Sequence, residues 1–274
     1  MLECGTSNEL LMTYAQAIVL GVVQGLTEFL PVSSSGHLIL VPRLFGWPDQ
    51  GLAFDAAMHL GTLGALLAYF RVELIELATG EMDRAVAALL IAASLPALAV
   101  GWLAHAWIEA NVRSPMIIAV ATAAWGLVLW WADRRAVEAR GGTGDALTRV
   151  GWGQGLAVGC AQTLALIPGT SRSGITISAG LFARLDRATA ARFSFLLGIP
   201  VTAAAGGYKL LHLLHDGIPS GEAGPLALAI LVAFASGWLA VWFLVSYLKR
   251  RSLMPFVVYR LILAAVIFFV ILRG

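Results

Sequence analysis

Six long apolar segments constrain the fold of this chain more than any other feature of its sequence. A helix needs about 20 mostly apolar residues to cross a bilayer, and each segment is close to that length. Only 12% of the residues are charged, whereas soluble domains usually carry about 25%. The sequence therefore predicts an all-α polytopic membrane protein, surrounded by membrane lipid, with spans at 52–70, 85–107, 115–132, 191–211, 225–247 and 255–272.

Two further apolar stretches, 14–45 and 150–185, are interrupted by polar turns. The predicted turns are 31–36, between helices that end at Leu30 and begin at His37, and 168–174, between helices that end at Ile167 and begin at Ile175. Irregular backbone at membrane depth is tolerated only where protein or a water-filled cavity covers it. Both stretches are therefore expected to be re-entrant helical hairpins with their tips near the midplane.

The two hairpins match each other when one is shifted by 138 residues, about half of the 274-residue chain. The matched residues are Gly21, Gln24, Leu26, Ser33, Ser35 and Gly36 with Gly159, Gln162, Leu164, Ser171, Ser173 and Gly174. Each half then holds one hairpin and three spans. Because three is odd, the second half enters the membrane upside down. We expect one membrane domain, 1–274, built as an inverted-topology repeat of about 1–137 and 138–274.

Lys and Arg near the ends of the spans predict the orientation. Of the 18 basic residues, twelve fall on one side, four on the other, and Arg172 and Arg260 lie inside the membrane. The positive-inside rule makes the twelve-residue side cytoplasmic, which places both termini and the mouth of the first hairpin on the opposite side. No basic stripe interleaves with aromatic residues, so nucleic acid is not an expected partner.

The polar residues of the hairpins are the candidates for chemistry, because ionisable groups inside a membrane cost about 2.5–3.5 kcal/mol each. Glu28 follows Gln24 by four residues, so both project from one helix face. Glu28 has three alternative roles: a structural ion pair with Arg172, a general base or a metal ligand.

Both turns are typical of an anion site. A helix start offers free backbone N–H groups and a positive dipole end, which suit a phosphate. Arg172 adds a planar fork that binds phosphate oxygens in bidentate fashion. One serine of the first turn is expected merely to cap its helix. The predicted binding residues are Gln24, Ser33, Ser35, Gly36, Ser171, Ser173, Gly174 and Thr176.

His37 is a candidate catalytic residue, because it follows three serines at the predicted anion site and can exchange a proton near neutral pH. His59, Asp55 and His105 lie in or near spans without such neighbours and are interpreted as structural. Arg260, in the last span, is expected to pair with an acid or with carbonyls, or to reach the interface.

Two motifs, QGLTEFLPVSSSGH at 24–37 and PGTSRSGIT at 168–176, resemble those of the undecaprenyl-diphosphate phosphatases of the bacitracin-resistance type. The similarity runs the length of the chain and includes FSFLLGIP at 193–200 and PFVVYR at 255–260. It implies removal of the terminal phosphate from undecaprenyl diphosphate on the periplasmic side of the bacterial inner membrane. That reaction recycles the lipid carrier for peptidoglycan synthesis and confers resistance to bacitracin.

The resemblance also implies dependence on a divalent cation, Mg²⁺ or Ca²⁺, with Glu28 as the metal ligand. Many family members carry a glutamate where this chain has Gln24, so a second carboxylate ligand is missing here. Glu28 with substrate phosphates and water would still suit Mg²⁺, which often uses one or two carboxylates. The oligomeric state stays open, with a homodimer as one alternative.

The expected catalytic residues are Glu28, Ser34, His37 and Arg172. Ser34 is the preferred nucleophile, with Glu28 or His37 taking its proton; attack by water or by His37 stays open. A different class of function, a lipid-carrier flippase or secondary transporter, is the alternative, because such proteins also use inverted repeats with broken helices.

Overall fold

The computed structural model describes residues 12–48, 51–112, 114–136, 146–216 and 221–273. Within these residues it contains helices and turns and no strand. The six long helices are α3 (Gly51–Tyr69), α5 (Arg84–Asn111), α6 (Pro115–Arg134), α9 (Arg187–Asp216), α10 (Ala223–Leu248) and α11 (Met254–Arg273). They correspond one to one to the six predicted spans. The all-α membrane architecture is confirmed.

Five of these helices are long and apolar enough to cross a membrane. The exception is α3, whose apolar part, Ala57–Tyr69, is shorter. Large apolar side chains face outward from the bundle: Leu103 is 83% exposed and Leu272 is 69% exposed. Lipid rather than water suits such a surface. A short helix that was not predicted, α4 (Arg71–Thr79), follows α3, and its Glu73 pairs with Arg192 of α9 at 2.9 Å.

The first hairpin consists of α1 (Tyr14–Phe29) and α2 (Ser34–Phe45). The second consists of α7 (Trp152–Gln162), the 3₁₀ turn η2 (Thr163–Leu166) and α8 (Arg172–Phe182). A second 3₁₀ turn, η1 (Ala146–Arg149), precedes α7.

The second helix of each hairpin begins three residues earlier than predicted, at Ser34 instead of His37 and at Arg172 instead of Ile175. The prediction counted the polar residues before those positions as turn. In the structure they form the first helical turn. Ser33 and Ser171 are the N-cap residues, and Ser171 Oγ accepts from the backbone N–H of Gly174, as serine commonly does at that position.

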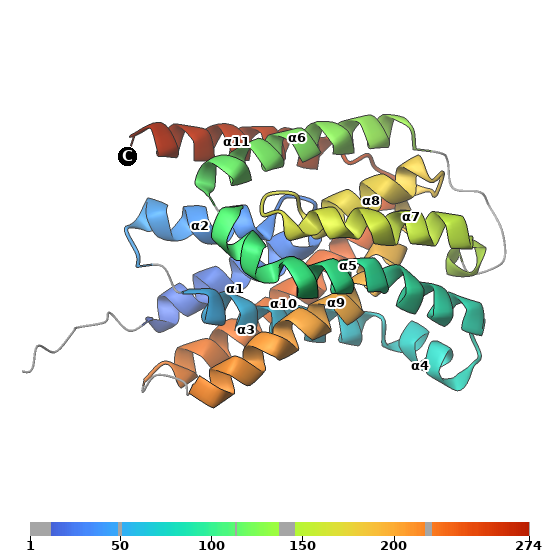
Figure 1. The fold of residues 1–274 in the computed structure, drawn as a ribbon, viewed down its shortest axis with the longest axis horizontal. Helices are drawn as coiled ribbons and strands as arrows, with labels where there is room; N and C mark the ends of the chain where they lie inside the picture. The colour runs from blue at the N-terminus through green and yellow to red at the C-terminus, as the bar shows by residue number, and fades with distance from the viewer. Residues whose placement is uncertain (1–11, 49–50, 113, 137–145, 217–220, 274) are drawn as a thin grey trace, which may run out of the picture.

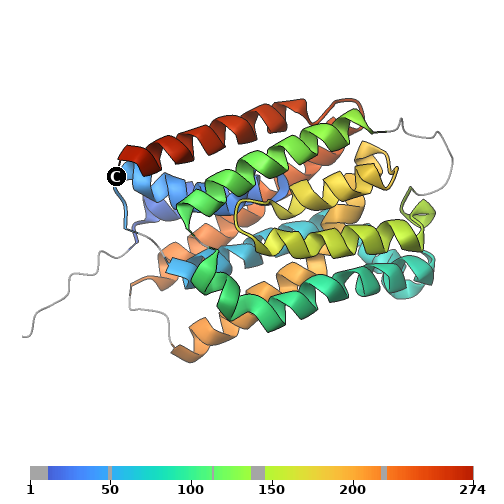
Figure 2. The same cartoon turned by 45° about the horizontal axis from the view of Figure 1, so that its top comes forward.

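The hairpins enter the bundle from opposite ends, and their tips meet in its middle (Figures 1 and 2). Each hairpin packs mainly against a long helix of the other half of the chain: α1 lies on α10, and α7 lies on α5. The equivalent helices α6 and α11 lie side by side (Figure 1), as α3 and α9 do. This exchange of partners supports the internal repeat. Its boundaries, and its orientation in the membrane, stay predictions.

Two matched glycines allow the close packing of the hairpins. A Cβ atom at Gly21 of α1 would lie 2.8 Å from the backbone oxygen of Ala229 in α10. One at Gly159 of α7 would overlap the backbone oxygen of Ala93 in α5. Small residues of this kind let membrane helices approach backbone to backbone. A matched glycine therefore brings each hairpin close to the backbone of a long helix from the other half of the chain.

Candidate active site

The two tips share an unusual backbone conformation. Ser33 has φ 74° and Ser171 has φ 69°, both in the left-handed region that non-glycine residues rarely adopt. At each tip the hydroxyl of this serine is hydrogen bonded to the hydroxyl two residues on, at 3.3 Å: Ser33 to Ser35 and Ser171 to Ser173. Such strain persists only where surrounding structure enforces it, and it clusters at functional sites.

Hydrogen bonds between the tips provide that enforcement. The backbone N–H of Gly169 donates to Ser35 Oγ at 3.1 Å, and Ser173 Oγ donates to the backbone oxygen of Leu30 at 3.3 Å. Ser35 and Ser173 occupy the same place in the repeat, so each hairpin uses one hydroxyl to hold the other. The predicted meeting of the two turns is confirmed.

Arg260 of α11 joins the same two tips and is completely buried. Its guanidinium donates to the backbone oxygens of Thr122 at 3.1 Å, Pro31 at 3.4 Å and Gly169 at 2.9 Å. Pro31 and Gly169 are themselves equivalent, 138 residues apart. The sequence left three alternatives for Arg260: an acid, carbonyls or the membrane interface. The structure shows carbonyls.

Glu28, near the end of α1, is the centre of the polar network. Ser34 Oγ donates to Oε2 at 2.9 Å, and Gln24 Nε2 donates to the same oxygen at 3.2 Å. Arg172 Nη2 lies 3.3 Å from Oε1, and His59 Nε2 lies 3.5 Å from Oε2. The structure thus brings together three predicted catalytic residues, Glu28, Ser34 and Arg172.

Arg172 retains free hydrogen-bond donors after pairing with Glu28. Its Nε and Nη1 atoms are buried and have no partner among the described residues. Gly198 of α9 makes room for the guanidinium, since a Cβ there would overlap Nη1. A buried donor without a partner is costly unless a ligand satisfies it. The unpaired Nε and Nη1 atoms of Arg172, called its free edge below, therefore suit a phosphate oxygen.

His59 was interpreted as structural from the sequence, yet it is part of the network. Its Nδ1 atom donates to the backbone oxygen of Asp55 at 2.8 Å, which turns Nε2 toward Glu28. A signal was present in the sequence: a histidine inside an apolar span is costly to insert and is a functional candidate by default. The side chain of His105 lies outside the described residues.

His37 lies elsewhere. Its Nδ1 atom donates to the backbone oxygen of Ser33 at 2.7 Å, and its Nε2 atom lies 2.6 Å from the hydroxyl of Tyr259 in α11. The two rings are stacked with centroids 5.6 Å apart. Both ring nitrogens are thus engaged away from Ser34 and Glu28, and this geometry supports the turn at Ser33.

A cavity of about 270 Å³ opens beside the network. Its polar lining residues are Thr27, Glu28, Ser33, Ser34, Ser35, His59, Gln162, Ser171, Arg172 and Thr202, and Ala97 and Val201 are among its apolar lining residues. The other predicted binding residues lie behind this wall. Gln24 contacts Glu28, the backbone N–H of Gly174 donates to Ser171 Oγ, and Thr176 is hydrogen bonded to Ser194.

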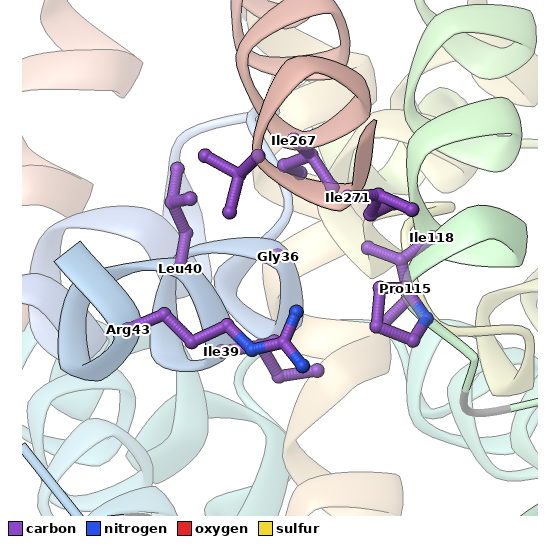
Figure 3. A pocket seen from close by; sticks show the side chains of 9 residues that line it. Gly36, Ile39, Leu40, Arg43, Pro115, Ile118, Ile267 and Ile271 are labelled. Carbon is purple, nitrogen blue, oxygen red and sulfur yellow. The ribbon is translucent and has the colours of Figure 1, made fainter. Parts of the chain in front are cut away.

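Gly36 lines a second, apolar groove between α2, α6 and α11 (Figure 3). Ile39, Ile118 and Ile267 form much of its wall, and Arg43 supplies its one charged group. Figure 3 shows the guanidinium of Arg43 reaching across the groove toward Pro115. A groove of this composition suits hydrocarbon rather than a reaction of phosphate.

Residues 17–266 match the family model described as bacitracin resistance protein BacA. The chain belongs to that family. Its bacitracin-resistance relatives include undecaprenyl-diphosphatase 2 of Stutzerimonas stutzeri strain A1501, 47% identical over 93% of this chain and 97% of the relative. The undecaprenyl-diphosphatase of Pelobacter propionicus strain DSM 2379 is 44% identical over 96% and 99%. That of Alcanivorax borkumensis strain SK2 is 44% identical over 94% and 99%. The family resemblance drawn from the two motifs is confirmed.

The site of this bacitracin-resistance protein also fits the cation that the resemblance implies. Gln24 Oε1 is buried and has no hydrogen-bond partner among the described residues, and Nε2 of the same amide donates to Glu28 Oε2 at 3.2 Å. Carboxylate and amide oxygens are ligands that Mg²⁺ and Ca²⁺ prefer. The described residues contain no group of three or more His, Cys, Asp or Glu that could hold a metal ion. Glu28 and Gln24 would therefore hold the cation together with substrate oxygens.

Proposed function

We propose that this chain hydrolyses undecaprenyl diphosphate to undecaprenyl phosphate and inorganic phosphate in the cavity between the hairpin tips. The family and the names of the relatives give the reaction. One observation supports assigning the reaction to this cavity. Ser34 Oγ donates to Glu28 Oε2 at 2.9 Å, beside the unpaired donors of Arg172. A hydroxyl, a base within hydrogen-bond reach and an anion site are the groups that phosphoryl transfer to serine needs.

The first step is attack of Ser34 Oγ on the terminal phosphorus. The hydroxyl proton moves to Glu28, the new bond forms between Oγ and phosphorus, and the bond to the bridging oxygen breaks. Undecaprenyl phosphate leaves with the electron pair of that bond. Water then attacks the same phosphorus, the bond from phosphorus to Oγ breaks, and inorganic phosphate leaves. Glu28 returns its proton to Oγ, which restores the serine hydroxyl, and the proton of the attacking water leaves with the phosphate. Direct attack by water on the same phosphorus is the alternative, and Ser34 would then position the substrate.

Stabilisation of charge is the larger task, because a diphosphate brings several negative charges into an apolar surrounding. The free edge of Arg172 and the starts of α2 and α8 aim donors and positive dipole ends at the tips. A bound divalent cation, held by Glu28 and Gln24, would neutralise further phosphate charge. His59 Nε2 lies 3.5 Å from Oε2 of Glu28, the oxygen that also accepts from Ser34 and Gln24.

The membrane placement combines an observation with a prediction. The apolar outer surface makes the chain an integral membrane protein. The distribution of Lys and Arg supports an orientation with both termini on the periplasmic side. The family resemblance implies the bacterial inner membrane and a cavity that opens to the periplasm. Single cysteines introduced at Ser7 and Arg273, probed with a membrane-impermeant thiol reagent in intact spheroplasts, test this orientation after Cys4 and Cys160 are replaced. Labelling of both supports it, and labelling only after lysis contradicts it.

Release of phosphate from a prenyl diphosphate by the purified protein in detergent, measured with and without chelator, tests the function. The proposal predicts turnover that chelator lowers and Ser34→Ala abolishes. Movement of intact lipid between vesicle leaflets without phosphate release would favour the alternative, a flippase on the same fold.

A further inference from the structure

Gln162, the last residue of α7, has hydrogen-bonding capacity that the protein does not use. Its side chain is 1% exposed, and neither its amide nitrogen nor its amide oxygen has a partner among the described residues. It lies in the wall of the same cavity as Ser34 and Arg172. A buried amide without partners is destabilising, and in a folded protein such a group needs an explanation.

Comparison of the two halves of the repeat explains why the amide of Gln162 has no partner. Gln24 is the equivalent of Gln162, and its amide donates to Glu28 four residues later. The residue four positions after Gln162 is Leu166, which also lines the cavity. The second hairpin therefore keeps the amide and lacks the carboxylate that would engage it.

We propose that Gln162 binds the second phosphate of the substrate, the one that carries the prenyl group; this assignment rests on the proposed function. The first hairpin supplies Ser34 and Glu28 to the terminal phosphate. Residues of both tips line the cavity, and the tips are tied by one hydrogen bond made by each of the equivalent serines Ser35 and Ser173. Gln162, in the second hairpin, thus lies where it would contact the other of the two linked phosphates of the diphosphate.

The neutral amide suits this phosphate for a chemical reason. The prenyl phosphate is the product that must leave, and a neutral donor binds it less tightly than a second arginine would. The amide N–H would donate to an oxygen of this phosphate. The amide oxygen can at the same time accept from water that enters with the substrate.

The test is Gln162→Met, which keeps the length of the side chain and removes both polar atoms. With farnesyl diphosphate as substrate, we expect kcat/KM to fall about tenfold or more, the loss typical of one hydrogen bond to a charged group. Inhibition by farnesyl monophosphate should weaken by a similar factor. Inhibition by inorganic phosphate should stay within about twofold, because that product occupies the other subsite. Gln162→Glu, which adds a like charge, should reduce kcat/KM further.

A matched control is Gln154→Met on the same helix. The amide of Gln154 donates to the backbone oxygen of Ala183 at 2.6 Å, outside the cavity. Gln154→Met should lower thermal stability and leave both inhibition constants unchanged. Gln162→Met should keep or raise thermal stability, because it removes an unpaired buried amide.

Two results overturn the assignment: unchanged kinetics and inhibition in Gln162→Met, or weaker inhibition by inorganic phosphate alone. In both cases an active unmodified protein leaves the proposed function standing. Absence of phosphate release from the unmodified protein would overturn the function, and the role of Gln162 with it.

Discussion

Arg172 begins a helix of the second hairpin, and its guanidinium lies 3.3 Å from the carboxylate of Glu28 in the first. The two residues are 144 positions apart in the chain, and both side chains are almost completely buried. The pair closes the catalytic site across the boundary between the halves. The ion pair leaves two nitrogens of Arg172 without a partner among the described residues. It therefore orients the guanidinium and leaves hydrogen-bond donors available for substrate.

Replacement of either member of this pair should stop turnover. Arg172→Ala removes the phosphate donors and should lower kcat/KM by about three orders of magnitude. Glu28→Gln removes the base and should cost about 10²–10⁴-fold. Phosphate release, measured on protein whose monodisperse peak in gel filtration matches the unmodified protein, checks both. Near-normal turnover in either variant would refute the site.

Ser34 and water as nucleophiles predict different intermediates. If Ser34 attacks, rapid acid quenching during turnover should trap phosphate on the peptide that contains Ser34, detected by mass spectrometry. Ser34→Ala should then show neither adduct nor turnover. An active Ser34→Ala protein would instead assign the attack to water.

The two histidines should behave differently from the sequence-based expectation. His59→Ala removes a direct neighbour of Glu28 and should lower kcat about tenfold or more. Tyr259→Phe removes the partner of His37 Nε2 and should cost about 1 kcal/mol of stability with turnover within a few-fold. A large loss of turnover in Tyr259→Phe at unchanged stability would return His37 to a catalytic role.

Arg260 should be essential for the fold of the tips. Arg260→Met removes the guanidinium that donates to three buried carbonyl oxygens, and it should lower the free energy of unfolding by about 3 kcal/mol. Arg273→Met, on the same helix, is the control, since this guanidinium is exposed and stacks over the ring of Phe269. Thermal unfolding in detergent compares them. Equal melting temperatures would show that the tips do not depend on Arg260.

Two glycines of α7 provide a test of hairpin packing. Gly159→Ala places a Cβ against the backbone of α5 and should destabilise the protein by about 1–3 kcal/mol. Gly153→Ala meets no atom within 4 Å, and alanine favours a helix by up to about 1 kcal/mol over glycine. Thermal unfolding should therefore show a lower melting temperature for Gly159→Ala and an equal or higher one for Gly153→Ala. Similar melting temperatures would contradict the close approach of α7 and α5.

The sequence was sufficient for the long helices, for the paired tips and for the proximity of Glu28, Ser34 and Arg172. Length and apolarity decide a membrane span locally, and the motif around Glu28 and Ser34 is contiguous. The position of His37 depends on Tyr259, which is 222 residues away. The recruitment of His59 depends on how α3 packs beside α1. Neither contact has a local pattern, so neither could be predicted from spacing alone.

The helix starts were misplaced for a related reason. The first turns of α2 and α8 contain polar residues that a composition argument assigns to a loop. Ser33 and Ser171, the residues before these helices, have positive φ. The hydroxyls of Ser35 and Ser173, two residues further on, are hydrogen bonded to the opposite hairpin. Tertiary contacts therefore decide where these helices begin.

The reciprocal bonds between the tips have a consequence for biosynthesis. Gly169 and Ser173, which hold the first turn, emerge from the ribosome more than a hundred residues after it. A newly inserted first half thus carries its acid and its serine without the neighbours that shape them. Hydrolytic competence arises only when the second half has entered the bilayer, so a prematurely terminated chain cannot attack the lipid carrier.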